Sequence, residues 1–108
     1  MRNYKLYIDD IIESIEKILA YTKNYSYSQF IKDSKTYESV LLNLFVIGEA
    51  ANKIPDDVQE KYPVIDWRGI TGMRNIIAHG YFNIKPDIVW KTVQEDIPEL
   101  LLMIKRIN

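Results

Sequence analysis

The sequence predicts an all-α protein, an up-and-down bundle of four main helices with short extra helical turns. Apolar residues recur at steps of three and four along most of the chain, which is the period of an amphipathic helix. No stretch of four or more residues shows the clean alternation of a half-buried strand. With 108 residues, the chain is long enough for one sizeable core and too short for two, so residues 1–108 are expected to form a single domain.

The first main helix is expected over residues 4–22, where one apolar stripe contains Tyr4, Ile8, Ile11, Ile12, Ile15, Ile18 and Leu19. A polar connector follows it. Ser26 and Gln29 have the spacing of a capping box, which predicts a short helical turn through residue 31.

The second main helix is expected from residue 34, with Ser34 as its N-cap, to residue 54. Pro55 disfavours helical geometry at the residue before it, so the helix should end there. One face of this helix carries small side chains that would allow another helix to approach closely, those of Gly48, Ala50 and Ala51.

A short turn over residues 56–61 precedes the third main helix, which is expected from residue 67 to about residue 79 with Asp66 as its N-cap. Gly69 and Gly72 lie inside it and each costs about 1 kcal/mol relative to alanine, so a backbone or a ligand is expected to pack against that face. The last helix begins near residue 86. Pro98 should kink or split it, because proline removes one backbone hydrogen bond and clashes with the preceding turn.

Composition and charge exclude several classes of protein. The chain has no cysteine, which rules out disulfides, thiolate zinc sites and cysteine nucleophiles. Fourteen basic against fifteen acidic side chains give a formal net charge of −1, so a nucleic acid would have to be held by a local patch or an assembled interface. The apolar runs are far shorter than the ~20 residues of a membrane span, and acids interrupt the N-terminal apolar stretch before a signal-peptide core forms. A cytoplasmic protein is expected.

The candidate chemistry lies around His79, the only histidine in the chain, with Arg74, Asn75 and Tyr81 close to it in sequence. Imidazole can give or take a proton near neutral pH, and guanidinium donates paired hydrogen bonds to a phosphate. These groups suit cleavage of RNA, whose 2′-hydroxyl can attack the adjacent phosphorus without a metal. A mechanism that uses two histidines would require a symmetric dimer.

Helix geometry limits how these side chains meet. Asn75 and His79 project about 40° apart around a regular helix, whereas Arg74 and His79 are about 140° apart. Arg74 and His79 therefore converge only through the reach of the arginine, a helix distortion or a second subunit. Structural roles also fit each residue: a helix-end histidine that complements the dipole, a surface ion pair for Arg74, a hydrogen bond for Asn75 and packing for Tyr81.

Other candidates are weaker. Two acidic groups have a helical spacing that could bind a divalent cation, but solvated faces and helix-start acids explain them better, and no metal site is predicted: Asp9, Asp10 and Glu13, and Asp56, Asp57 and Glu60. Three clustered tyrosines fit a base-stacking surface or, more simply, loop packing: Tyr21, Tyr25 and Tyr27. The two tryptophans, Trp67 and Trp90, fit core or interface anchors. Glu49 is a candidate partner for Arg74 or Arg68.

A family resemblance rests on short segments that occur in one order: Gly48-Glu49-Ala50-Ala51, Ile54-Pro55, Tyr62-Pro63, Trp67-Arg68, Gly72-Met73-Arg74-Asn75, His79-Gly80-Tyr81, Val89-Trp90 and Ile97-Pro98. This string resembles the HepT-like branch of the HEPN superfamily over roughly residues 7–104. The most specific part is an arginine, four residues, a histidine, one residue and a tyrosine, matched here by Arg74, His79 and Tyr81.

The resemblance implies a HEPN-like fold and a metal-independent endoribonuclease, the toxin of a type II- or type VII-like toxin–antitoxin module, with tRNA among the targets in the family. It implies that Arg74 and His79 are catalytic, that Asn75 supports them, and that no cofactor is needed. The implied partner is an MNT-type nucleotidyltransferase antitoxin that transfers AMP onto the motif tyrosine, here Tyr81. Family members form homodimers whose two motifs face each other across the interface.

AMP on Tyr81 would place bulk and negative charge beside the catalytic pair and would repel the RNA backbone. Arg68, Lys85 and Lys91 are candidate RNA contacts, although surface solubility explains each of them equally well. The alternative function is a non-catalytic helical binding module that docks a nucleotidyltransferase or its substrate, because a fold alone does not decide activity. A helical dimer that keeps the motif for interface structure is a third interpretation.

Overall fold

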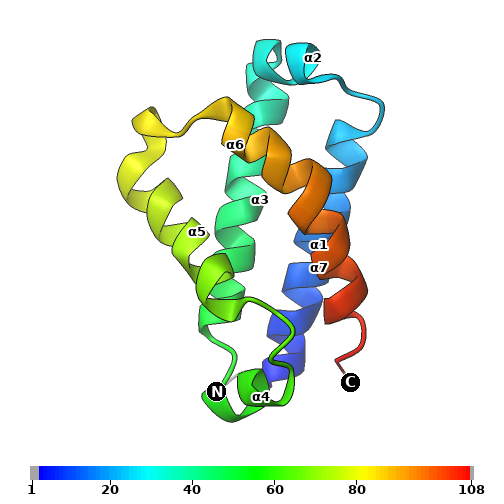
Figure 1. Cartoon of the computed structure of the whole chain (residues 1–108), viewed down its shortest axis with the longest axis vertical. Coiled ribbons are helices and arrows are strands. Elements are labelled where there is room, and N and C mark those ends of the chain that lie inside the picture. Colours follow the sequence, from blue (N-terminus) through cyan, green and yellow to red (C-terminus); the bar gives the residue numbers. More distant parts are fainter. Residues whose placement is uncertain (1–2, 108) are drawn as a thin grey trace.

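The computed structural model describes residues 3–107, apart from the side chain of Phe82, and this part of the chain contains helices and no strand. Four helical stretches run alternately up and down the molecule (Figure 1). They are α1 (Tyr4–Thr22), α3 (Ser34–Asn52), α5 (Trp67–Gly80) and a C-terminal stretch of α6 (Pro86–Lys91), the π-helical turn η2 (Thr92–Asp96) and α7 (Ile97–Ile104). Shorter elements connect them, namely α2 (Tyr27–Lys32), α4 (Asp56–Lys61) and the 3-10 turn η1 (Tyr81–Asn83). The predicted all-α, up-and-down bundle is confirmed.

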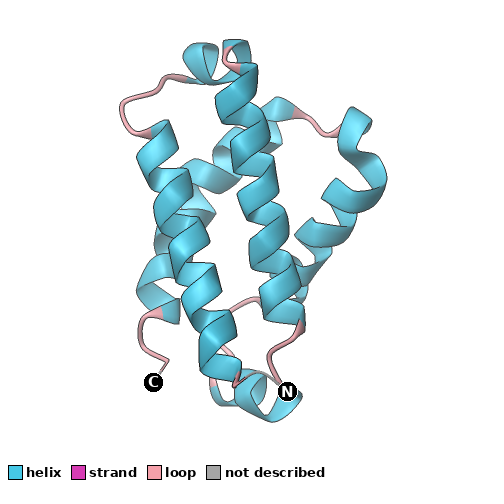
Figure 2. Ribbon diagram, turned by 180° about the vertical axis from the view of Figure 1, so that it is seen from behind, coloured by secondary structure: helices cyan, strands magenta, loops and turns pink. Residues whose placement is uncertain are grey.

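The central pair of the bundle is α1 and α3, which lie side by side and antiparallel (Figures 1 and 2). The C-terminal stretch covers one side of this pair. α5 packs on α3 and, among the long helices, on no other to a comparable extent within the described residues. Its C-terminal end diverges from α3 in both views, and Trp67 is its only buried residue, so Arg74 and His79 lie on the least buried of the long helices.

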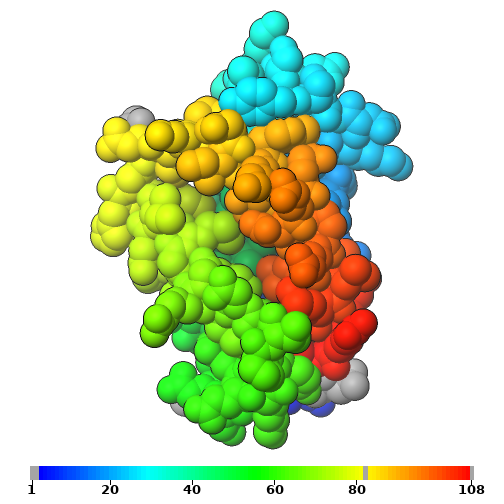
Figure 3. Space-filling view, viewed as in Figure 1, coloured from blue at the N-terminus to red at the C-terminus, as the bar shows by residue number. Residues whose placement is uncertain are grey.

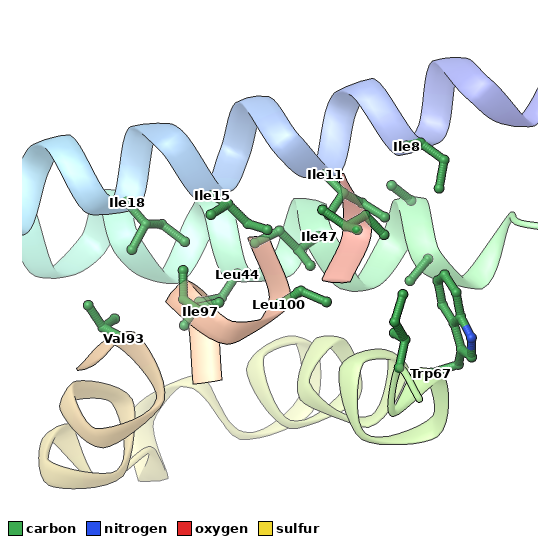
Figure 4. Close-up of a cluster of buried hydrophobic side chains, with 14 of the residues drawn as sticks. Ile8, Ile11, Ile15, Ile18, Leu44, Ile47, Trp67, Val93, Ile97 and Leu100 are labelled. Carbon is green, nitrogen blue, oxygen red and sulfur yellow. The ribbon is translucent and has the colours of Figure 1, made fainter. Parts of the chain in front are cut away.

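The core joins α1, α3 and the C-terminal stretch through side chains at steps of three and four, as the apolar pattern predicts (Figure 4). Nine of the side chains labelled there are at most 5% exposed, those of Ile8, Ile11, Ile15, Ile18, Leu44, Ile47, Val93, Ile97 and Leu100. Burial of such apolar surface is the main stabilising contribution, about 25 cal/mol per Å². Trp67 is buried and donates from its indole nitrogen to the carbonyl of Tyr62 at 3.1 Å, and the ring centroid of Trp90 lies 5.0 Å from that of Phe30.

Two helix starts match the predicted caps. Ser26 and Gln29 form the capping box at α2, with hydrogen bonds of 2.9 and 3.1 Å. Asp66 caps α5 by accepting from the backbone N–H of Gly69 at 3.0 Å. A Cβ at Gly69 would lie 2.2 Å from the Asp66 carboxylate, whereas one at Gly72 would meet nothing within 4 Å. The expected backbone neighbour is therefore absent at Gly72 within the described chain, and the contact with the capping Asp66 explains Gly69.

The start and end of α3 differ from the prediction. Its N-cap is Asp33 and not Ser34, because the Asp33 carboxylate accepts hydrogen bonds from the backbone N–H of Thr36 at 3.1 Å, the Thr36 hydroxyl at 2.7 Å and the Tyr25 hydroxyl at 2.7 Å. A serine hydroxyl offers no comparable set of acceptor sites. The helix ends at Asn52, two residues earlier than expected, where the N–H of Lys53 bonds to carbonyls of the last turn.

The Asp33 cap makes the stability of the fold sensitive to acid. Hydrogen bonds from the Thr36 side chain, the Tyr25 side chain and the Thr36 backbone lower the pKa of Asp33 from 3.8 to about 2. A carboxyl whose folded-state pKa is depressed stabilises the fold above its unfolded pKa and loses that contribution as the pH falls through the folded pKa. Asp33→Asn keeps a capping oxygen without the charge, so we expect its thermal midpoint to fall less than that of the wild type between about pH 5 and pH 2.

Circular dichroism melts across this pH range measure the effect. Asp9→Asn, which removes an exposed carboxylate from α1, is the matched control and should follow the wild type. Equal pH slopes for the wild type and Asp33→Asn would contradict the role of the cap.

Of the two predicted effects of Pro98, a kink or a split, the structure shows no split, because residues 86–104 are helical without an interruption. The chain passes from α6 to α7 through η2, in which the N–H of Ile97 donates to the carbonyl of Thr92, five residues earlier. Proline lacks the N–H that an α-helix would use at the next position. The irregularity predicted at Pro98 therefore takes the form of a π turn directly before it, a known way of absorbing a disruption in a helix.

Candidate active site on helix α5

Arg74 of α5 packs directly against α3 because Gly48 of α3 has no side chain. A Cβ built at Gly48 would lie 2.5 Å from the Cβ of Arg74, 3.2 Å from its Cα and 3.0 Å from the carbonyl oxygen of Ile70. Only a residue without a side chain fits between the two helices at this point. The predicted close approach to the small-residue face of α3 is thus confirmed at Gly48, and its neighbour on the other helix is the motif arginine.

The Arg74 guanidinium has two partners. Its Nε donates to the carboxylate of Glu49 on α3, forming an ion pair in which both side chains are about one-third exposed. Its Nη1 donates to the Oδ1 of Asn75 at 2.8 Å. Of the two predicted partners of Glu49, the structure selects Arg74. The remaining N–H groups of the guanidinium make no hydrogen bond within the described residues, so they are available to phosphate oxygens.

His79 lies in the last turn of α5 with an exposed side chain. Within the described part of the chain, it forms no hydrogen bond or ion pair with the other motif residues. Along the helix it is about 7.5 Å beyond Arg74 and about 140° around the axis. One copy of the chain therefore presents the imidazole and the guanidinium on different sides of α5, as helix geometry predicts.

Tyr81 begins η1 and is 42% exposed. Its hydroxyl donates to the carboxylate of Glu38 on α3 at 3.4 Å. Desolvation, the negative charge of Glu38 and this hydrogen bond together raise the pKa of the Tyr81 phenol above its ordinary value of 10.0. The hydroxyl thus keeps its proton at neutral pH and is reachable from solvent.

Glu38 is a functional neighbour that the sequence analysis missed. It lies 43 residues before Tyr81, so no local pattern connects the two. A signal was present in the helix itself, because Glu38 and Glu49 are eleven residues apart and project within about 20° of each other. One face of α3 therefore carries two carboxylates, and each contacts one residue of the motif.

The three candidate RNA contacts are spread over the first turn of α5 and the two ends of α6. Arg68, Lys85 and Lys91 are all exposed. Arg68 is in the first turn of α5, beside a hollow also lined by acidic side chains, those of Asp56, Glu60 and Asp66. Lys85 precedes α6 and Lys91 ends it. No contact within the described residues joins these cations to Arg74.

A hollow of about 370 Å³ lies between α5 and the C-terminal stretch (Figure 3). Its lining combines apolar side chains such as Ile70 and Met73 with carboxylates and includes no lysine, arginine or histidine; the carboxylates are Asp66, Asp96 and Glu99. The negative charge of these carboxylates makes the hollow unsuited to binding a phosphate. Among residues 3–107, no three histidine or carboxylate side chains gather as metal ligands do, and no helix there has the length and hydropathy of a membrane span.

The all-α bundle and a match to a family model of ribonucleases place the chain in the class of all-α ribonucleases. It belongs to the HepT-like ribonuclease family, whose model matches residues 11–107. The resemblance seen in the sequence is confirmed, and so, at the level of the family, is the prediction of a ribonuclease.

Relatives support the same assignment. The chain is 41% identical to the probable ribonuclease HepT of Thermococcus cleftensis over 99 residues, which is 92% of this chain and 90% of the relative. Two Methanocaldococcus jannaschii proteins named as candidate RNases are 37% and 40% identical, each over 92% of this chain and over 91% and 82% of their own lengths. No solved structure matches the chain.

Proposed function

We propose that this chain is a metal-independent endoribonuclease that acts as the toxin of a toxin–antitoxin module in the cytoplasm. The proposal rests on the arrangement of Arg74. Glu49 and Asn75 hold its guanidinium and leave some of its N–H groups without a hydrogen bond, and the same helix exposes His79. In the reaction, the RNA 2′-hydroxyl loses its proton and attacks the adjacent phosphorus, and the 5′-oxygen leaves with a proton. His79 moves protons, and Arg74 stabilises the charge on the phosphate oxygens.

The active form in this proposal is a homodimer. One chain supplies one histidine and holds it on the far side of α5 from Arg74, so a second copy would provide the second proton-transfer group. Ile76 of α5, two residues after Arg74, is a large apolar side chain that is 62% exposed, and a second copy would cover it. In such a dimer, the positive charges of two Arg74 side chains would also offset the negative charges of the α3 carboxylates. Arg68, Lys85 and Lys91 remain candidate contacts to the longer RNA.

The test is cleavage of total tRNA and of a long RNA by purified protein in EDTA. We expect cleavage of at least one of them. An unmodified, dimeric protein that cleaves neither RNA would instead favour the helical binding module.

Tyr81 is the proposed control point, where an MNT-type nucleotidyltransferase would attach AMP. The exposed Tyr81 hydroxyl, which donates a hydrogen bond to Glu38, would release its proton as its oxygen bonds to the α-phosphorus of ATP and pyrophosphate leaves. We expect Tyr81→Phe to retain RNA cleavage but to escape the mass increase of one AMP that the wild type shows after incubation with its transferase and ATP. Intact-protein mass spectrometry measures this, and Tyr21→Phe, an exposed tyrosine on α1, is the control. AMP at the same level on Tyr81→Phe would rule out this assignment.

A further inference from the structure

We propose that Glu49 is a positioning residue that fixes the orientation of the Arg74 guanidinium toward the scissile phosphate. This inference rests on the proposed ribonuclease function and extends it to a second helix. The carboxylate comes from α3, and the arginine comes from α5. The pair is therefore a tertiary contact that forms only when the two helices are packed together.

The backbone around Glu49 makes the contact short and constrained. Gly48, the residue before it, lets the Cα of Arg74 come within van der Waals distance of α3. The long arginine side chain would otherwise sample many rotamers, and it would lose that conformational freedom on binding a ligand. Here the orientation is set before RNA arrives.

Two acceptors from different directions fix the plane of the guanidinium. Glu49 accepts from Nε, and Asn75 accepts from Nη1 at 2.8 Å. A planar group that is held at two of its nitrogens has little rotational freedom. Both N–H groups of Nη2 stay outside these contacts and are left for the phosphate. Orientation of this kind acts mainly on the transition state, where charge on the phosphate oxygens increases.

Replacing Glu49 by glutamine or by alanine distinguishes a positioning role from a proton-transfer role. Glutamine keeps an oxygen that can accept from Nε but does not exchange protons as a carboxylate does, whereas alanine offers no acceptor. Positioning therefore predicts that Glu49→Ala lowers kcat by about tenfold with KM changed less than about twofold, and that Glu49→Gln stays within about threefold of the wild type. A proton-transfer role for Glu49 predicts that both variants lose activity equally.

The experiment is steady-state cleavage of tRNA in EDTA by the wild type, Glu49→Ala, Glu49→Gln and the control Glu16→Ala, which removes an exposed carboxylate from α1. Glu49→Ala is also added to Arg74→Ala, where positioning predicts no further loss, because Glu49 acts through the arginine. Thermal melts confirm that each variant is folded. NMR of the arginine Nε–H gives a readout apart from activity, with the Arg74 signal protected in the wild type and Glu49→Gln and exchanging in Glu49→Ala.

Equal kcat for the wild type and Glu49→Ala, equal losses in Glu49→Ala and Glu49→Gln, or losses that multiply in the Arg74→Ala background would each overturn the positioning role. In these cases the wild type still cleaves, so the proposed function stands. A wild type that cleaves no RNA would overturn the proposed function and this role with it.

Discussion

His79→Ala is expected to lower RNA cleavage by about 10³-fold while leaving the fold and the proposed dimer intact. A positioned acid or base contributes roughly 10²–10⁴-fold to such a reaction, and the chain has no second histidine to replace it. The side chain is exposed and forms no hydrogen bond or ion pair among the described residues, so its removal should leave packing unchanged. Single-turnover cleavage of tRNA, with light scattering for the dimer mass, measures both effects. Loss of the dimer together with activity would indicate an interface role instead.

The same assay applied to Arg74→Ala should show a loss of about 10²–10³-fold, the range for removing one oriented donor from a developing anion. Arg74→Lys should not restore full activity, because a lysine ammonium does not reproduce the planar pair of contacts to Glu49 and Asn75. Arg106→Ala removes an exposed arginine after α7 and is the matched control. Equal cleavage by Arg74→Ala and Arg106→Ala would remove Arg74 from the mechanism.

Gly48→Ala is expected to destabilise the fold by up to about 2 kcal/mol. Alanine favours a helix over glycine by about 1 kcal/mol, but its methyl group would lie 2.5 Å from the Cβ of Arg74 and 3.0 Å from the carbonyl oxygen of Ile70. Because backbone atoms are among these neighbours, α5 must move away from α3, and overpacking of this kind costs about 1–3 kcal/mol. Urea unfolding measures the change, and cleavage should fall with it because Arg74 moves away from Glu49.

Gly72→Ala is the control for this prediction. It makes the same change on α5, where an added Cβ would meet nothing within 4 Å, so it should stabilise the monomer by roughly 0.5–1 kcal/mol. If the two alanine variants changed stability in the same direction, the close approach at Gly48 would not be what determines the packing of α5.

The sequence was sufficient to predict the helices because their signals are local. Apolar steps of three and four placed α1 and α3, and Ser26 and Asp66 marked two helix starts. The errors arose where neighbouring residues compete for one role. Asp33 and Ser34 are both good N-caps, and the hydroxyl of Tyr25, eight residues away from Asp33, contributes to the choice between them. At Pro98 the sequence predicted a disturbance but did not specify a π turn.

The candidate site was predictable as a list of residues but only partly as an arrangement. The spacing of Arg74 and His79 already indicated that they diverge on a regular helix, and the structure agrees. Glu49 had two equally good partners in the sequence, and only the packing of α5 on α3 decides for Arg74. Glu38 was not predictable from local spacing, because its contact to Tyr81 depends on how far two antiparallel helices overlap.

Because α3 is the main long neighbour of α5, the packing of α5 on α3 decides how α5 separates from the bundle. A helix that packs on one partner and diverges at its end has fewer contacts to break than α1 or α3, so it should be the first to separate from the bundle and the first whose amides exchange with solvent. Anything that covers its outer side, whether RNA, an antitoxin or a second copy, would then stabilise the helix by mass action. Folding of α5 and occupancy of its surface are in this way coupled, so the protection of its amides from hydrogen exchange would measure how much of the helix is bound.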